Sequence, residues 1–181
     1  MRLWTLQNEE VYNAIMQEGK YRCIESKSEN LESRHFKRSY KWLVGEMEKR
    51  IGKAPKGIDY PVWAWLRKPD LRSKDYAPCK GIFYRIEFEI DPKNVLCTDF
   101  NHWHCVLNYS PLITIEDLEE WNAEYDRIER LMPVSERIRI IEESWNGVIY
   151  DGIPETNRLV QVTFWELRKE QIKKIEKFYS K

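Results

Sequence analysis

Residues 82–90 alternate strictly between apolar and polar side chains, and this pattern constrains the fold more than any other in the chain. Such a period of two is typical of a β-strand with one buried face. The apolar positions are Ile82, Tyr84, Ile86, Phe88 and Ile90. Arg85, Glu87 and Glu89 would project to the other side. The sequence therefore predicts a sheet with at least one strand long enough to cross a core.

Four further segments favour extended backbone. They are residues 2–6, 60–67, 95–98 and 159–165. In the segment 60–67, Val62, Ala64 and Leu66 alternate with Trp63, Trp65 and Arg67. In the last segment, Val160, Val162 and Phe164 form an apolar face, with Gln161, Thr163 and Trp165 on the other. Each of these strands is expected to present two different faces.

Helical periodicity is clearest in residues 36–51, which Gly52 would end. The apolar stripe is Phe36, Tyr40, Leu43, Val44, Met47 and Ile51. Further helices are predicted to begin after Asn8, Asp99 and Thr114, whose side chains can cap a first turn. The Thr114 helix would place Leu118, Trp121, Tyr125 and Ile128 on one side. Residues 133–143 and 169–179 also read as helices.

Helices and strands follow one another without regular βαβ alternation. We therefore predict an α+β fold with a mixed, mostly antiparallel sheet and flanking helices. No linker or internal repeat interrupts the 181 residues, so residues 1–181 are expected to form a single globular domain.

The charges balance, with 30 Lys plus Arg and 30 Asp plus Glu. This neutrality argues against a dedicated nucleic-acid or membrane-surface binder, although it does not exclude a local patch. The four cysteines Cys23, Cys79, Cys97 and Cys105 form no C-x-x-C pair. Because no apolar signal segment opens the sequence, we expect free thiols and a cytoplasmic location. No apolar run approaches the length of a membrane span.

Familiar catalytic motifs are missing. The sequence has no P-loop, no G-x-G-x-x-G and no G-x-S-x-G. His102 and His104 stand two residues apart, a spacing that does not share a helix face, so no metal site is predicted.

Polar residues among aromatic ones on the predicted strands are the best functional signal. Burying Gln and Thr beside Trp requires hydrogen bonds, whereas a ligand pocket uses a few polar groups on an aromatic wall. The predicted pocket residues are Thr5, Gln7, Trp63, Trp65, Asp99, Trp103, Gln161 and Thr163. The alternative is a helix-covered sheet face in which Gln or Thr accepts hydrogen bonds from Trp.

Four separated motifs resemble an uncharacterised bacterial family, domain-of-unknown-function family 3841. They are RLWTLQ at residues 2–7, YPVWAW at 60–65, VLCTDF at 95–100 with Trp103 and 106–108, and QVTFWEL at 161–167. The resemblance covers nearly the whole chain and implies no established activity.

A weaker resemblance is to the ADP-ribosyltransferase fold. Its opening strand and helix match residues 3–7 and 8–19, and its closing strand and short C-terminal helix match 159–165 and 169–179. The resemblance implies NAD or a related nucleotide as the cofactor and puts Gln161 near the catalytic Glu of that fold. Gln can make the hydrogen bond to a ribose hydroxyl but supplies no charge for a developing cation.

Two hypotheses follow. In the first, the chain is an active or degenerate ADP-ribosyltransferase-like enzyme that uses NAD or another nucleotide, with Gln161 in the catalytic position. In the second, it is a non-catalytic module that binds a small nucleotide or a protein partner through its aromatic pocket residues. Single-stranded nucleic-acid binding is a third, weaker reading, because it needs a basic groove.

Overall fold

The computed structural model describes residues 1–23, 34–73, 80–156 and 159–180. Its strands are β1 Arg2–Asn8, β2 Lys20–Arg22, β3 Val62–Trp65, β4 Gly81–Glu89, β5 Leu96–Asp99, β6 Val160–Phe164, β7 Glu166–Arg168 and β8 Ile172–Ser180. Its α-helices are α1 Glu9–Glu18, α2 Arg34–Ile51, α3 Phe100–Leu107, α4 Leu118–Asp126 and α5 Val134–Ser144. A π-helical turn, Arg127–Leu131, follows α4 directly and precedes α5. Short 3-10 turns span Pro92–Asn94, Trp145–Val148 and Lys169–Gln171.

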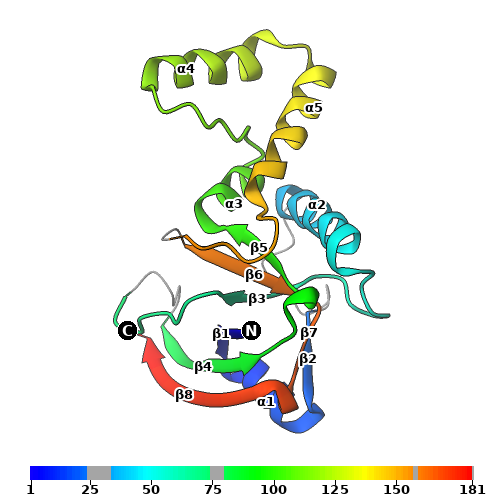
Figure 1. The fold of residues 1–181 in the computed structure, drawn as a ribbon, viewed down its shortest axis with the longest axis vertical. Coiled ribbons are helices and arrows are strands. Elements are labelled where there is room, and N and C mark those ends of the chain that lie inside the picture. Colours follow the sequence, from blue (N-terminus) through cyan, green and yellow to red (C-terminus); the bar gives the residue numbers. More distant parts are fainter. Residues whose placement is uncertain (24–33, 74–79, 157–158, 181) are drawn as a thin grey trace.

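Six strands form one antiparallel sheet in the order β5-β6-β3-β1-β4-β8. β2 and β7 pair separately, also antiparallel. In Figure 1, the helices α2, α3 and α5 lie on the β5–β6 side of the molecule, whereas α1 lies near β4 and β8. The predicted α+β class with a mostly antiparallel sheet and flanking helices is confirmed.

Each face of the sheet contributes to its own apolar core. The first core packs one face against α1, and its fully buried members include Leu3, Ile15, Ile86, Phe88, Val162 and Phe164. The second core lies under α2, α3 and α5, and it includes Leu43, Met47, Trp103, Ile141 and Trp145. The alternation predicted for β4 and β6 is thus confirmed, except that Ile82 at the start of β4 is exposed and Arg85 on its polar face is buried.

The predicted helix starts are mostly correct. Asn8 accepts a hydrogen bond from the Val11 backbone at 2.9 Å and caps α1, which ends at Gly19 with φ of 77°. α2 ends before Gly52, as expected, but Phe36 on its predicted inner stripe is exposed. The cap of α4 is Asp117 rather than Thr114, because the Asp117 carboxylate accepts from two backbone N–H groups at 2.9 and 3.0 Å.

The predicted C-terminal helix 169–179 is wrong. A short 3-10 turn is followed by the nine-residue strand β8, which pairs with β4 and forms an edge of the sheet. The pairing register shifts between Glu87 and Phe88, so that Ile172 faces Phe88 and Ile175 faces Ile86. This bulge brings two residues three apart onto one face, which imitates helical spacing.

Candidate functional site

A single row of side chains crosses all six strands on the face that bears the second core. Its members, from β5 to β8, are Thr98, Gln161, Trp65, Trp4, Glu87 and Lys174. Each member is the direct cross-strand partner of the next, so neighbouring side chains lie within contact distance. We call this set the cross-sheet row.

The β5 end of the cross-sheet row is buried, and its β8 end is exposed to solvent. Thr98 is fully buried and donates from Oγ1 to the Gln161 carbonyl at 3.3 Å. Gln161, Trp65 and Trp4 are half-buried, and Lys174 is exposed. Helix α3 covers the β5 end, where Phe100 packs on Trp65 with ring centroids 5.2 Å apart. The two tryptophans therefore lie where the helical cover of the sheet ends.

Polar groups flank the tryptophan pair on both sides. On one side, Trp4 donates from Nε1 to the Glu87 carboxylate at 3.2 Å, and Arg2 lies 3.3 Å from the same carboxylate. On the other side stands the Gln161 amide, for which the described residues provide no side-chain hydrogen bond. An amide carries two donors and an acceptor, so this group keeps its full hydrogen-bonding capacity.

Three other predicted residues lie deeper on the same face. Trp63 faces Thr163 across β3 and β6, and Thr163 is fully buried with its hydroxyl 3.4 Å from the Leu96 carbonyl. Trp63 donates to the Tyr40 hydroxyl at 3.2 Å and packs on Trp103 with centroids 5.3 Å apart. This inner group resembles the predicted helix-covered face, although the Trp63 N–H goes to Tyr40 rather than to Gln or Thr.

Thr5 and Gln7 project from the opposite face of the sheet. They alternate with Trp4 along β1, and Thr5 is the cross-strand partner of the core residue Ile86. Gln7 donates to Thr5 Oγ1 at 2.6 Å, and Thr5 in turn donates to the Trp63 carbonyl at 2.8 Å. Gln7 also lines a cavity of ≈ 410 Å³ beside α1, together with Glu10 and Tyr21. Burial, followed by the nearby Cys23, raises the pKa of Tyr21.

Asp99 is not a member of the cross-sheet row either. It follows Thr98 directly along β5, and successive residues of a strand face opposite sides of the sheet. Its Oδ1 caps α3 by accepting from the backbone N–H groups of Asn101 and His102 at 2.9 and 3.0 Å. The Tyr150 hydroxyl donates to Oδ2 at 2.9 Å. Burial alone would raise the pKa of Asp99, but these hydrogen bonds outweigh it and lower the pKa. The predicted cap of the helix at Asp99 is confirmed.

The register thus divides the eight predicted residues. Gln161, Trp65, Trp63, Thr163 and Trp103 share one side of the sheet, whereas Thr5, Gln7 and Asp99 do not join them. Sequence reasoning missed Trp4 and Glu87 as members of the row. Their positions on β1 and β4 were readable from the alternation, but their neighbours depend on pairing between distant segments.

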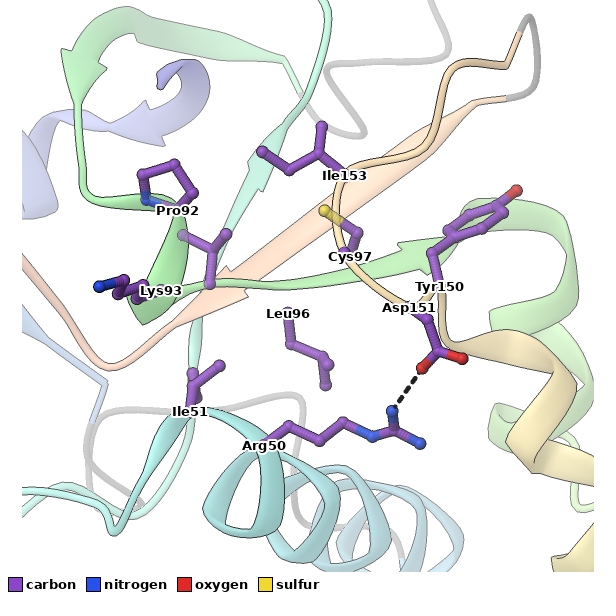
Figure 2. A pocket seen from close by; sticks show the side chains of 11 residues that line it. Arg50, Ile51, Pro92, Lys93, Leu96, Cys97, Tyr150, Asp151 and Ile153 are labelled. Atoms are coloured by element: carbon purple, nitrogen blue, oxygen red, sulfur yellow. Dashed lines mark hydrogen bonds and ion pairs between the residues drawn. The ribbon is translucent and has the colours of Figure 1, made fainter.

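A second cavity, of ≈ 200 Å³, lies beside β5. Figure 2 shows Leu96, Ile51 and Ile153 around it, with Arg50 and Asp151 joined by an ion pair of 2.9 Å at one side. Its eleven lining residues include none of those predicted from the sequence. Cys97 also lines it, and burial raises the pKa of this thiol to about 11.

Within the described part of the chain, no three His, Cys, Asp or Glu side chains gather closely enough to hold a metal ion. No disulfide joins Cys23, Cys97 or Cys105, and Cys79 lies outside the described residues. None of the described helices has both the length and the apolar composition needed to cross a membrane.

Comparison with known proteins gives a family but no activity. Searches of curated proteins and of solved structures each found no match. The resemblance to ADP-ribosyltransferases receives no support, and the closing helix on which it partly rested is the strand β8. The family model of DUF3841, a domain of unknown function, matches residues 2–173, which is nearly the whole chain. The chain belongs to the family DUF3841.

Proposed function

We propose that this protein binds a ligand with a planar heterocycle, such as a nucleotide, at the Trp4, Trp65 and Gln161 positions of the cross-sheet row. The observation that supports the proposal is the half-buried Gln161 amide, without a side-chain partner among the described residues, beside two paired tryptophans.

The chemistry of the three side chains favours a flat, hydrogen-bonding ligand. The indole rings of Trp offer large apolar faces, and stacking of a base on an aromatic ring contributes roughly 1–3 kcal/mol. The Gln161 amide can meet both a donor and an acceptor on the edge of such a ring. Sites of this kind combine an aromatic wall with few polar groups.

Binding is proposed here without catalysis. In an NAD-using enzyme, Gln161 would hold the ribose hydroxyl but would supply no negative charge to the transition state. Glu87 is the carboxylate of the row, and it already accepts from Trp4 and pairs with Arg2. A binding role requires only the Gln161 amide and the two indole rings, and it needs no charged catalytic group.

The test compares Gln161→Ala with Gln7→Ala. Both variants remove a half-buried amide from the same sheet, but the two amides lie on opposite faces. Thermal shift and calorimetric titration would be run with NAD, ADP-ribose and adenine nucleotides, with urea unfolding of each variant. We expect Gln161→Ala to weaken binding about tenfold, equivalent to about 1.4 kcal/mol, and Gln7→Ala to bind like the wild type.

The unfolding data separate the two interpretations of Gln161. If Gln161→Ala loses affinity and unfolds like the wild type, the amide serves a ligand. If no nucleotide shifts the melting temperature of the wild type, and Gln161→Ala is destabilised by about 1–3 kcal/mol, the amide is structural and the proposal is wrong.

A further inference from the structure

The cavity of ≈ 200 Å³ beside β5 lies apart from the tryptophan pair. Three segments enclose it, namely the end of α2, residues 92–97 and residues 150–153 (Figure 2). None of its lining residues belongs to the cross-sheet row. Since β5 is an edge strand of the six-stranded sheet, the cavity lies at the outer edge of that sheet.

The segment 150–153 covers only part of this edge. The Tyr150 N–H donates to the Cys97 carbonyl at 3.0 Å, and the chain then turns at Gly152, where φ is 86°. Val95 stands two residues before Cys97, so its backbone groups point to the same edge. Val95 is only 8% exposed, and its N–H and C=O form no hydrogen bond with the described residues. A buried amide without a partner is costly, which favours an occupant that can make hydrogen bonds.

The walls of the cavity are mostly apolar. Leu96 is almost fully buried, whereas Ile153 is 46% exposed. The Cys97 thiol adds no charge, because burial raises its pKa to about 11. An apolar cavity of about 150 Å³ can hold a benzene ring, so this one has room for an aliphatic tail of about five to seven carbon atoms. The apolar side chains that line it are Ile51, Pro92, Val95, Leu96 and Ile153.

The charged lining residues leave one positive charge in excess. They are Arg50, Lys93 and Asp151. Arg50 lies 2.9 Å from Asp151, but the Asp151 side chain is 96% exposed, so solvent screens this pair and makes it weak. Arg50 also lies 3.5 Å from Glu46, whose closer cation is Lys49 at 2.6 Å. Lys93 forms no ion pair with the described residues. The excess charge favours a ligand that carries a single negative charge.

We propose that this cavity binds a short aliphatic monocarboxylate such as hexanoate. The tail would lie between Leu96, Ile51 and Ile153, and the carboxylate would accept from Arg50 in place of Asp151. A guanidinium and a carboxylate can form two parallel hydrogen bonds, which fixes the orientation of the ligand. A phosphate monoester carries about two negative charges and would reverse the excess, and an amine would increase it.

Calorimetric titration of the full chain with butyrate, hexanoate and octanoate tests the size of the site. We expect the affinity to rise about fourfold for each methylene group from butyrate to hexanoate, because each buried methylene adds apolar contact. Octanoate should gain less, since its tail exceeds the cavity. Hexan-1-ol and hexylamine have tails of the same length without the negative charge, and both should bind at least about tenfold more weakly than hexanoate.

Substitutions test the role of the charge. Arg50→Gln should weaken hexanoate binding about tenfold. The matched control is Lys49→Gln, which removes a positive charge from the neighbouring position of α2 and from the same carboxylate, Glu46, but does not line the cavity. Ile153→Asp places a negative charge at an exposed position of the lining and should also weaken binding. Circular dichroism and urea unfolding check that each variant folds.

The result is independent of the proposed nucleotide binding, because Gln161→Ala should bind hexanoate like the wild type. The proposal is overturned if none of the three carboxylates binds the wild type. Equal affinities for hexan-1-ol and hexanoate would also overturn it, as would equal losses in Arg50→Gln and Lys49→Gln.

Discussion

Replacing Glu176 by Gln is expected to destabilise the protein by about 1–3 kcal/mol at neutral pH. The Arg85 side chain is only 10% exposed, and its Nε and Nη2 donate to Glu176 Oε2 at 2.9 and 2.5 Å. A glutamine can still accept a hydrogen bond, but it leaves the buried guanidinium without its ionic partner. Since Arg85 also donates to the Pro69 carbonyl, the loss should remain within this range.

The pH dependence of this loss has a definite sign. The hydrogen bond from Arg85, and then that from Lys174, lowers the pKa of Glu176 from 4.5 to about 2. A carboxyl with a depressed pKa stabilises the folded state above its unfolded pKa, and this contribution is lost as the pH falls through the folded value. The free-energy difference between wild type and Glu176→Gln should therefore be constant near neutral pH and shrink between pH 4.5 and about 2.

Urea unfolding, followed by tryptophan fluorescence at several pH values, measures this difference. Glu170→Gln is the matched control, because the Glu170 side chain is 69% exposed and lies 3.9 Å from Arg168. The control should change stability by well under 1 kcal/mol. If Glu176→Gln behaves like Glu170→Gln at neutral pH, the β4–β8 pairing does not bury the Arg85 charge as argued.

Three further changes have definite expected outcomes. Leu43→Ala should cost about 2–5 kcal/mol in urea unfolding, because Leu43 is fully buried in the second core; a loss well under 1 kcal/mol would reject this. Asp99→Ala should cost about 1–2 kcal/mol in the same assay, since α3 loses its cap; an unchanged midpoint would argue against it. Thiol titration in denaturant without reductant should detect four free thiols, and a mass showing two disulfides would contradict this expectation. Cys97 should react with iodoacetamide far more slowly in the native protein than in the denatured protein, because burial raises the pKa of its thiol.

Most helices and strands could be predicted because the sequence signals that mark them involve residues only a few positions apart. The period of two in β4 and the capping side chains of α1 and α3 each act within a few residues. A strand such as β4, with one face in the core, needs no distant information to be recognised. The α+β class then follows from the order of the elements along the chain.

The C-terminal segment shows where local reasoning fails. Ile172 and Ile175 stand three apart, and charged residues surround them, which is the pattern of an amphipathic helix. In the structure Lys173 is the extra residue of a bulge, so both isoleucines face the first core from a strand. The segment is extended because β4 offers it a partner edge, and that edge lies about ninety residues away along the chain.

The candidate site has the same dependence on distant pairing. The alternating pattern assigned Gln161 and Trp65 to the polar–aromatic faces of their own strands. It could not predict whether these two faces would lie on the same side of the sheet. The antiparallel register joins Gln161 to Trp65 and Trp65 to Trp4, while it turns Thr5 toward the other core. A shift of one residue between β1 and β3 would separate the tryptophans and place Leu3 or Thr5 opposite Trp65, depending on its direction. The candidate site is thus a property of the sheet register, and any substitution that changes the register should abolish the proposed ligand binding even if it leaves all three side chains in place.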